Sequence, residues 1–332
     1  MSRAALIVLL FAVVACSRTE TPKLNRPAIP AGWPGISAVD DNPWNAERAE
    51  LGKELFFEPL LSNNRNVSCA TCHQPATAWT VNEDLIMGTE GTRFFRHPPS
   101  LLNVGFFTSW HWDGGTTSLE KQVLAPLENP DEMNMRADSL ILRLRRDAYY
   151  RDRFMSVYGK EPDMYGVTRS LGAYQRSLIS ARSKWDRVET GNEALTEVEA
   201  RGQDLFFSDS LACSECHVPP LFTDLLFHNN GRWQWGDFDP GRSRVTLDSL
   251  DRGKFKTPTL RNVAVTRPYF HDGSAVDLES VLVHYENGGN GNQLQDSRIR
   301  SFQLSHSDRS AILTFIMTLT DTSSMNDPQL KP

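Results

Sequence analysis

The sequence predicts a mainly α-helical protein made of two tandem domains with long loops and little β-structure. Two observations predict this fold class: the second half of the chain repeats segments of the first, and the repeated segments place apolar residues at helical spacing. The 19 Pro and 21 Gly residues supply the loops. A chain of 332 residues is long enough for two domains that each bury a core.

The internal repeat can be followed along much of the chain. The stretch ELGKELFF at 50–57 matches ARGQDLFF at 200–207, and both have the apolar spacing of a short helix. Further on, PSLLNV at 99–104 matches PTLRNV at 258–263 at an offset of 159 residues, which other matched pairs share. Two copies are too few for a solenoid, so we expect a duplicated module rather than an array.

The first residues, MSRAALIVLLFAVVACS, resemble an export signal. Their apolar run suits a signal peptide and is too short to span a bilayer. The residues before Cys16 resemble a bacterial lipobox. We therefore expect a signal peptide with a lipobox cysteine at 1–16, a periplasmic protein, and a lipid anchor to the outer membrane at Cys16; a plain signal peptide cut nearby is the alternative. Residues 17–44, rich in Pro and polar residues, are predicted to be a tether.

Charge and cysteine content narrow the class of protein. The formal net charge of −6 indicates no nucleic-acid partner, and 39% hydrophobic with 23% charged residues is typical of a globular protein. Five cysteines would be an odd count for an exported disulfide protein. Without Cys16, four remain, and all four lie in two Cys-x-x-Cys-His motifs.

The two motifs predict two covalently bound haems. They consist of Cys69, Cys72 and His73, and of Cys213, Cys216 and His217. A zinc site would normally place its two cysteine pairs about 12–20 residues apart, whereas 144 residues separate these, and a thioredoxin-like site needs no adjacent histidine. A c-type haem explains every residue, because the thiols bond to the vinyl groups and the histidine ligates the iron. We expect cytochrome c-like domains at 45–190 and 191–332.

The repeat also predicts what faces the open side of each haem. In the second copy, the predicted helix in LESVLVHYENGG carries His284 and Tyr285 as candidate iron ligands. The position equivalent to Tyr285 in the first copy is Pro126, which has no donor side chain. We therefore expect Tyr285, or His284 in its place, to ligate the second iron and the first iron to keep an open position. A tyrosine that only packs in the core or lies at the surface is the alternative.

An open iron in an exported protein favours chemistry on a small oxidant such as hydrogen peroxide. Haem peroxidases place an acid–base residue and a polar partner over the open face. The segment SLEKQVLAPLENPDEMN carries Gln122 and Glu132 on either side of Pro126. Glu132 is the candidate acid and base, and Gln122 is the candidate group that fixes peroxide or its water. In isolation, both would more often be solvated positions.

With WDGGTTSLEKQVLAPLENPDEM and KTPTLRNVAVTRPYFHDG, these motifs give the chain a family resemblance. From about Asn45 to Leu319 it resembles the bacterial di-haem cytochrome c peroxidases, and it is most similar to their MauG-like branch. The resemblance implies a peroxidatic N-terminal haem with Glu132 as acid–base and Gln122 as its partner. It also implies that Trp112 relays electrons between the haems and that the C-terminal haem is the electron-transfer centre.

The resemblance has further implications at the two irons. Tyr285 stands where ordinary peroxidases have a methionine ligand, and a phenolate oxygen favours ferric iron more than methionine does. Peroxidases of the methionine type close the first iron with a loop histidine, and no histidine occurs here between His73 and His97. We therefore expect an open first iron, with Met87 and His97 as the residues that would close it.

The family also implies a calcium ion between the domains. Its ligands would be the backbone carbonyls of Thr266 and Pro268 and an asparagine side chain. His97 stands at the asparagine position, whereas calcium prefers hard oxygen ligands.

The leading interpretation is a periplasmic di-haem peroxidase that reduces hydrogen peroxide with electrons from a small redox protein, a cytochrome c or a cupredoxin. The alternative is a MauG-like enzyme that uses peroxide to oxidise residues of a partner protein. A third interpretation, from another class, is a di-haem electron carrier without chemistry of its own. Such a carrier would need both irons six-coordinate and would have no use for Gln122 and Glu132.

Overall fold

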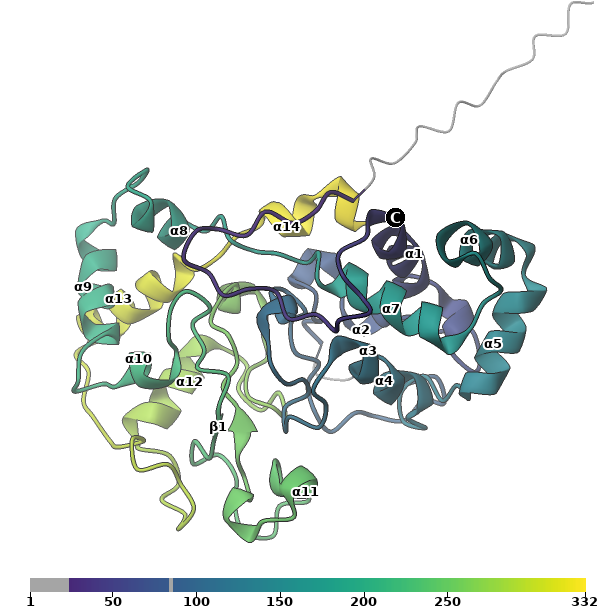
Figure 1. Cartoon of the computed structure of the whole chain (residues 1–332). Helices are drawn as coiled ribbons and strands as arrows, with labels where there is room; N and C mark the ends of the chain where they lie inside the picture. The colour runs from purple at the N-terminus through teal and green to yellow at the C-terminus, as the bar shows by residue number, and fades with distance from the viewer. Residues whose placement is uncertain (1–23, 84–85) are drawn as a thin grey trace, which may run out of the picture.

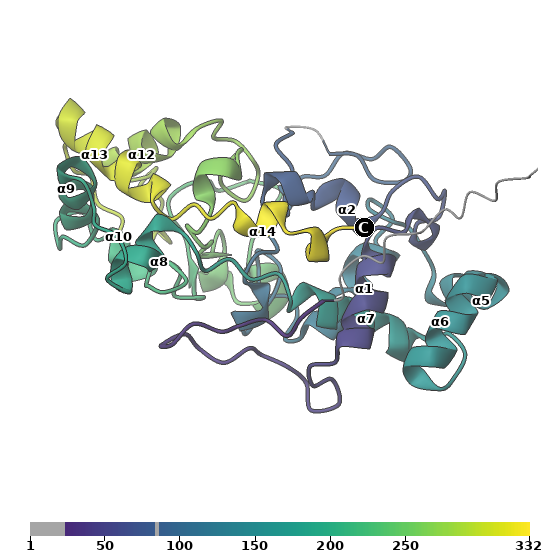
Figure 2. The ribbon, with the colours of Figure 1, turned by 90° about the horizontal axis from the view of Figure 1, so that it is seen from above.

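The computed structural model describes residues 24–83 and 86–332 and consists of two helical halves side by side (Figure 1, Figure 2). The α-helices are α1 (Ala46–Phe56), α2 (Cys69–Cys72), α3 (Leu119–Gln122), α4 (Leu124–Glu128), α5 (Ala137–Arg146), α6 (Ala148–Tyr158), α7 (Met164–Gln175), α8 (Lys184–Glu189), α9 (Glu197–Phe206), α10 (Cys213–Cys216), α11 (Ser243–Thr246), α12 (Leu278–Glu286), α13 (His306–Met317) and α14 (Ser323–Asn326). Two short strands, β1 (Phe227–His228) and β2 (Phe255–Lys256), pair antiparallel. The mainly α-helical prediction is confirmed.

The repeated glycines bring helix backbones into direct contact. In the first half α1 packs on α7, and in the second half α9 packs on α13. A Cβ on Gly52 of α1 would lie 1.9 Å from the carbonyl oxygen of Ser170, and one on Gly202 of α9 would lie 2.0 Å from that of Ala311. Both helix pairs therefore cross at a glycine that no larger residue can replace without moving a helix.

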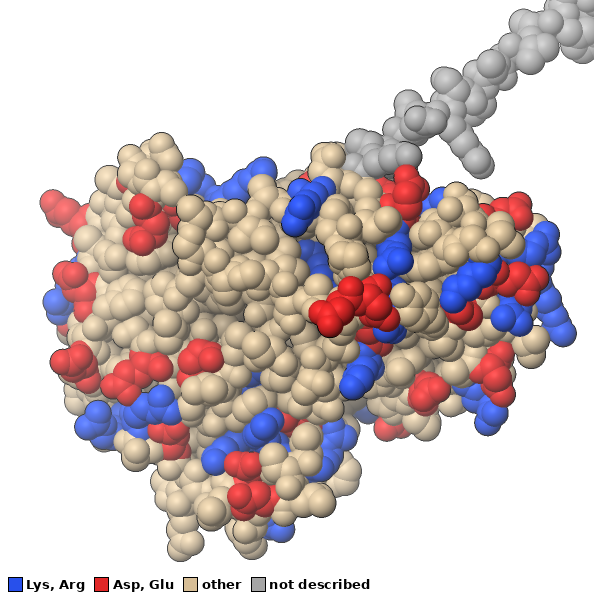
Figure 3. All heavy atoms as spheres, in the orientation of Figure 1, with Lys and Arg blue, Asp and Glu red and all other residues tan. Residues whose placement is uncertain are grey.

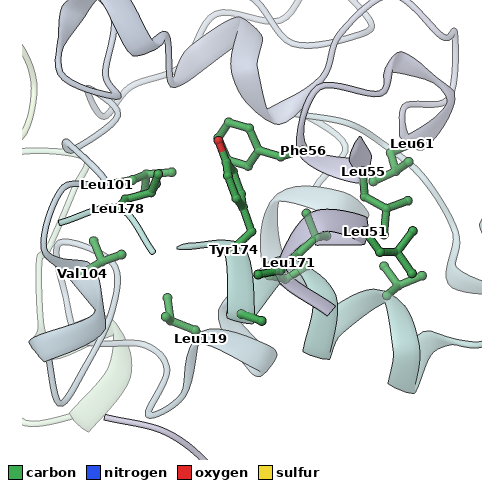
Figure 4. Close-up of a cluster of buried hydrophobic side chains, with 14 of the residues drawn as sticks. Leu51, Leu55, Phe56, Leu61, Leu101, Val104, Leu119, Leu171, Tyr174 and Leu178 are labelled. Carbon is green, nitrogen blue, oxygen red and sulfur yellow. The ribbon is translucent and has the colours of Figure 1, made fainter. Parts of the chain in front are cut away.

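Each half buries an aromatic core next to its Cys-x-x-Cys-His motif. Phe56 of α1 and Tyr174 of α7 have ring centroids 5.1 Å apart, and Figure 4 shows them among the leucines of this core. Phe206 of α9 and Phe315 of α13 make the equivalent contact at 5.3 Å. Tilted pairs of this kind add packing specificity to apolar burial. The duplication predicted from the sequence thus extends to the packing of the cores.

A buried polar junction joins the two halves at Ser180. Asn103 donates from Nδ2 to the Ser180 carbonyl at 2.9 Å and accepts from the Ser180 backbone N–H. The equivalent Asn262 donates to Ser180 Oγ at 2.7 Å and accepts from the backbone N–H of Asp321. Both asparagines thus provide hydrogen-bond partners for polar backbone and side-chain atoms that are buried between the halves. The predicted domain boundary between 190 and 191 stays a prediction.

The described part of the predicted tether packs against the body, where it follows the purple trace of Figure 1. Ser37 donates its backbone N–H to the Gly105 carbonyl at 2.7 Å. The Trp33 ring lies 5.2 Å from that of Phe106, and the Arg261 guanidinium lies 4.4 Å from the Trp33 centroid. The predicted signal peptide and Cys16 lie outside the described residues. Within 24–83 and 86–332, no helix combines the length and apolar character needed to cross a bilayer.

The glycine contact predicts the effect of one methyl group. Gly202→Ala should lower the free energy of unfolding by about 1–3 kcal/mol, because overpacking against the Ala311 carbonyl outweighs the better helix propensity of alanine. Thermal and denaturant unfolding of the holoprotein, followed by circular dichroism, measures this change. Asp204→Ala, at an exposed position of the same helix, is the control and should stay within about 0.5 kcal/mol of the parent. Equal stability of the two variants would contradict the close crossing.

Candidate haem-binding active site

The first Cys-x-x-Cys-His motif forms one wall of a cavity. The short helix α2 carries Cys69 and Cys72, and His73 follows it directly. His73 Nδ1 lies 3.0 Å from the backbone carbonyl oxygen of Trp79. Because a carbonyl oxygen can only accept, Nδ1 carries the proton and Nε2 remains as the ligand atom.

The space between the lining atoms amounts to about 620 Å³, part of which is open to solvent. Its lining unites the first motif with the residues predicted for the open face, namely Cys69, Cys72, His73, Gln122, Pro126 and Glu132. Burial raises the pKa of the Cys69 and Cys72 thiols to about 12, so both are uncharged at neutral pH. Neutral thiols beside this cavity and a histidine protonated on Nδ1 fit a covalently bound haem c.

Glu132 is held by the turn that follows α4. Asn129 donates from Nδ2 to Glu132 Oε1 at 2.9 Å, and Thr89 donates its backbone N–H to the Glu132 carbonyl at 2.7 Å. Burial raises the pKa of the Glu132 carboxyl, the charge of Asp131 adds to this, and the Asn129 hydrogen bond opposes it. A Cβ on Gly88 would lie 1.9 Å from the Asp131 carbonyl oxygen, so the 86–94 loop closes tightly over this turn. Glu132 is therefore a fixed carboxyl that protonates more readily than an exposed one.

The two candidate closing residues lie in different environments. Met87 lines the cavity, although its side chain is 48% exposed. His97 is not among the lining residues. Its Nε2 lies 2.8 Å from the carbonyl oxygen of Val81, and its own carbonyl accepts from Trp112 Nε1 at 2.8 Å. Of the two candidates, only Met87 lines the cavity of the first motif. Closure of the first iron by either residue stays a prediction.

The second motif repeats the geometry of the first. His217 follows α10, and its Nδ1 lies 3.1 Å from the Phe222 carbonyl oxygen. Burial raises the pKa of the Cys213 thiol to about 12 and that of Cys216 to about 11. Tyr285, the predicted second ligand, lies on α12. These residues also fit a haem c.

Tyr285 and His284 differ in what their polar atoms contact. Asn230 donates from Nδ2 to the Tyr285 hydroxyl oxygen at 3.3 Å. Its carbonyl oxygen lies 2.9 Å from His284 Nε2, and the His284 ring packs edge-on against Phe270. Burial raises the pKa of Tyr285, and the Asn230 hydrogen bond opposes that rise. Both polar groups thus contact Asn230, and the choice between Tyr285 and His284 as ligand of the second iron stays a prediction.

Trp112 lies at the contact between the two halves. Its carbonyl oxygen accepts from the backbone N–H of Lys256 at 2.7 Å. The next residue, Asp113, is fully buried and pairs with Arg96 of the first half and Arg244 of the second. Trp112 thus lies in the contact between the two halves, and its role as a relay stays a prediction.

The predicted calcium site has no further support in the geometry. His97, at the position of the expected asparagine, donates its backbone N–H to the His271 carbonyl. Asn82, oriented so that both of its amide atoms are satisfied, donates to the carbonyls of Val265 and Arg267 at 3.2 and 3.0 Å. Calcium at Thr266 and Pro268 stays a prediction.

Sequence reasoning missed Asn129 and Asn230, the two amides that contact the carboxyl and the phenol of the candidate site. Asn129 stands three residues before Glu132, a spacing that could have indicated a turn contact. Asn230 lies 55 residues from Tyr285, and no local pattern connects them.

Comparison with known proteins gives consistent matches. The family model of the di-haem cytochrome c peroxidases matches residues 46–194. The methylamine utilization protein MauG of Methylorubrum extorquens is 35% identical over 292 residues, which cover 87% of this chain and 83% of that protein. The cytochrome c551 peroxidase of Nitrosomonas europaea is 33% identical over 290 residues, covering 86% and 83%. A solved MauG-like protein associated with microbial copper homeostasis has a TM-score of 0.87 at 30% identity, covering 91% of this chain and 97% of that one.

The family model matches the first half alone, whereas the matches to the two relatives and to the solved structure extend over both halves and both Cys-x-x-Cys-His motifs. The resemblance inferred from the motifs is confirmed. The family is one of oxidoreductases and implies two c-type haems, which the residues of both sites fit. The chain belongs to the di-haem cytochrome c peroxidase family, together with MauG.

Proposed function

We propose that the protein is a periplasmic di-haem peroxidase that reduces hydrogen peroxide at the His73 haem, with electrons delivered through the Tyr285 haem from a small redox protein. One observation carries the proposal: a single cavity combines the first haem-binding motif with Gln122 and Glu132 and has Pro126 where the other half has Tyr285. Anchoring at Cys16 in the outer membrane is part of the proposal and rests on the lipobox-like sequence alone.

The bound haem supplies an open iron position for peroxide and stores two oxidising equivalents. Glu132 takes the proton from the peroxide oxygen nearest the iron and returns it to the departing oxygen, which leaves as water. Its raised pKa suits this task, because a group that both accepts and donates works best when its pKa is near the working pH. Gln122, at the end of α3, orients the peroxide by hydrogen bonds from its amide.

In this proposal the second haem site passes electrons to the first site and does not bind peroxide. Tyr285 would hold the second iron through its phenol oxygen, to which Asn230 donates a hydrogen bond. Trp112 carries the electrons between the sites. Two electrons and two protons convert each peroxide into two water molecules.

A second candidate function is the oxidation of residues in a partner protein. Tyr285 favours it, because an anionic oxygen ligand stabilises the higher oxidation states of iron more than a methionine does. The solved structure of a MauG-like protein and the match to MauG agree with this alternative. Both functions begin with peroxide at the first site and differ in what supplies the electrons.

Low-temperature EPR of the as-isolated ferric holoprotein tests the open first iron. We expect one high-spin signal from the His73 haem and one low-spin signal from the second haem, because Pro126 offers no ligand atom. Two low-spin signals would show that Met87 or another group closes the first iron. The protein would then be a reductively activated peroxidase or, without turnover, an electron carrier. Tyr285→Phe should change the low-spin signal and leave the high-spin signal in place.

Glu132→Gln tests the acid–base role. The rate constant for reaction of the ferric holoprotein with peroxide, measured by stopped-flow absorbance, should fall about 10²–10⁴-fold, because the amide cannot accept the peroxide proton. Glu128→Gln, at the exposed end of α4, is the matched control and should react like the parent. A parent-like rate in Glu132→Gln would remove this residue from the mechanism.

The groups that set the pKa of Glu132 predict a pH dependence. The reaction needs the deprotonated carboxylate, so its rate falls as pH falls through this pKa. Asn129→Ala removes the hydrogen bond that lowers the pKa, so the fall should begin at a higher pH. Asp131→Asn removes a charge that raises the pKa, so its profile should shift the other way. Stopped-flow rates across pH give both shifts, and shifts in one common direction would contradict the assignment.

A further inference from the structure

Gln175, the last residue of α7, is a buried amide in the wall of the first cavity. It is 5% exposed and lines the cavity together with Gln122 and Glu132. On the face of the molecule in Figure 3, by contrast, acidic and basic side chains are interspersed, so no field of one sign marks a ligand site there. The buried amide is the stronger indication of a binding role.

The two glutamine amides of the cavity have no partner within the protein. Among residues 24–83 and 86–332, no hydrogen bond involves the side chain of Gln122 or Gln175. A side-chain amide carries two N–H donors and two acceptor lone pairs, and burying it without partners costs free energy. The Glu132 carboxyl accepts from Asn129 instead. Both amides are therefore left to bind what enters the cavity.

The second half has an aliphatic residue at the position of Gln175. There α13 takes the place of α7, and Phe315 makes the core contact that Tyr174 makes in the first half. The next residue along the chain is Ile316 in α13 and Gln175 in α7, and both are buried. The duplicated core thus accepts an aliphatic side chain at this position, so packing alone does not require an amide.

The position of Gln122 shows the same difference between the halves. The repeat offset of 159 residues places Val281 of α12 there. The apolar lining residue Leu171, shown in Figure 4, keeps an apolar counterpart in Ile312, three positions before the aromatic residue of each helix. Both amides thus occur in the half proposed to bind peroxide and have apolar counterparts in the half where Tyr285 is the proposed ligand.

A buried ion pair fixes the end of α7 against α3. Arg176, the residue after Gln175, donates to the two carboxylate oxygens of Glu120 at 2.6 and 3.0 Å. Asn42 donates from Nδ2 to the same carboxylate at 2.7 Å, and all three side chains are buried. Separating such a pair would leave a buried charge without compensation. Because Glu120 stands two residues before Gln122, the pair holds the two glutamines in a fixed relation.

We propose that Gln175 is a second ligand-binding amide of the first haem site, which donates a hydrogen bond to peroxide together with Gln122. The inference rests on the proposed function, because it names a residue that holds the substrate of that reaction. Glu132 takes the peroxide proton, and the two amides donate N–H groups to the lone pairs of the peroxide oxygens. The pair of amides selects small ligands that accept hydrogen bonds.

Fluoride binding to the ferric holoprotein tests the second amide, because fluoride is a small ligand of ferric haem iron that accepts hydrogen bonds. Gln175→Met keeps the length of the side chain and removes its donors. The fluoride dissociation constant, titrated by haem absorbance, should rise about 10–100-fold, because a hydrogen bond to a charged group is lost. Gln122→Met should have a similar effect. The charge-transfer band of the fluoride complex should also shift in both variants.

Two further variants separate hydrogen bonding from packing. Leu171→Met, one turn earlier on α7 and also in the cavity wall, is the matched control and should bind fluoride as the parent does. Gln175→Ile introduces the residue of the second half and should weaken fluoride binding as much as Gln175→Met. It keeps the test valid if Gln175→Met does not fold.

Weaker binding in the Gln175 and Gln122 variants, with a parent-like Leu171→Met, supports the inference. Parent-like affinity in both Gln175 variants, with weaker binding in Gln122→Met, overturns the inference and leaves the proposed function intact. A ferric spectrum that changes before fluoride is added, with parent-like affinity, assigns Gln175 to the haem and also overturns it. Equal weakening in Leu171→Met overturns it in favour of packing. A parent that binds no fluoride has no open iron, which overturns the proposed function and the inference together.

Discussion

The hydrogen bond between each motif histidine and a backbone carbonyl is the constraint on which both sites depend. His73 Nδ1 is fixed to the carbonyl of Trp79, and His217 Nδ1 to that of Phe222. Both carbonyl-bearing residues are fully buried in their cores. The core therefore sets the plane and tautomer of each imidazole, and these determine where Nε2 points and where an iron would lie. The position of the iron in turn determines how far each group on the opposite side of the cavity lies from it.

The two halves share this scaffold and differ on its open side. In the second half, α12 is one continuous helix that carries Tyr285. In the first half, the corresponding stretch is divided into α3 and α4, and Pro126 has no N–H to donate to the preceding turn. The chain after α4 then turns back and brings in Glu132. One duplication thus yields two sites whose open sides differ, with Pro126 in one and Tyr285 in the other, as the proposed division between peroxide chemistry and electron supply requires.

Local patterns predicted the motifs, the repeat and the equivalence of Pro126 in the first copy to Tyr285 in the second. Each of these depends on spacing along the chain. Gln122 and Glu132 were predicted to face one haem, and they line one cavity with His73. The sequence did not reveal that His97 is engaged with the Val81 carbonyl or that Asn230 serves both Tyr285 and His284. A backbone carbonyl can belong to any residue, so contacts with it leave no mark in composition or periodicity. The packing of the predicted tether was missed for the same reason, since Ser37 bonds to a backbone carbonyl.

The contacts around Trp112 would fix the length of the proposed relay. Arg96 bridges Asp113 of its own half and Asp239 of the other at 2.8 and 2.7 Å, and the Asp113 side chain has no exposed surface. Separating such a pair would leave a buried charge without compensation, at a cost of about 3–5 kcal/mol. The Trp112 indole donates to the His97 carbonyl within the same contact. Electron transfer between two haem sites depends on their separation, and a contact this costly to open holds that separation constant. In the proposed mechanism, the reaction would therefore be controlled by what binds in the first cavity and by how fast electrons reach the second site.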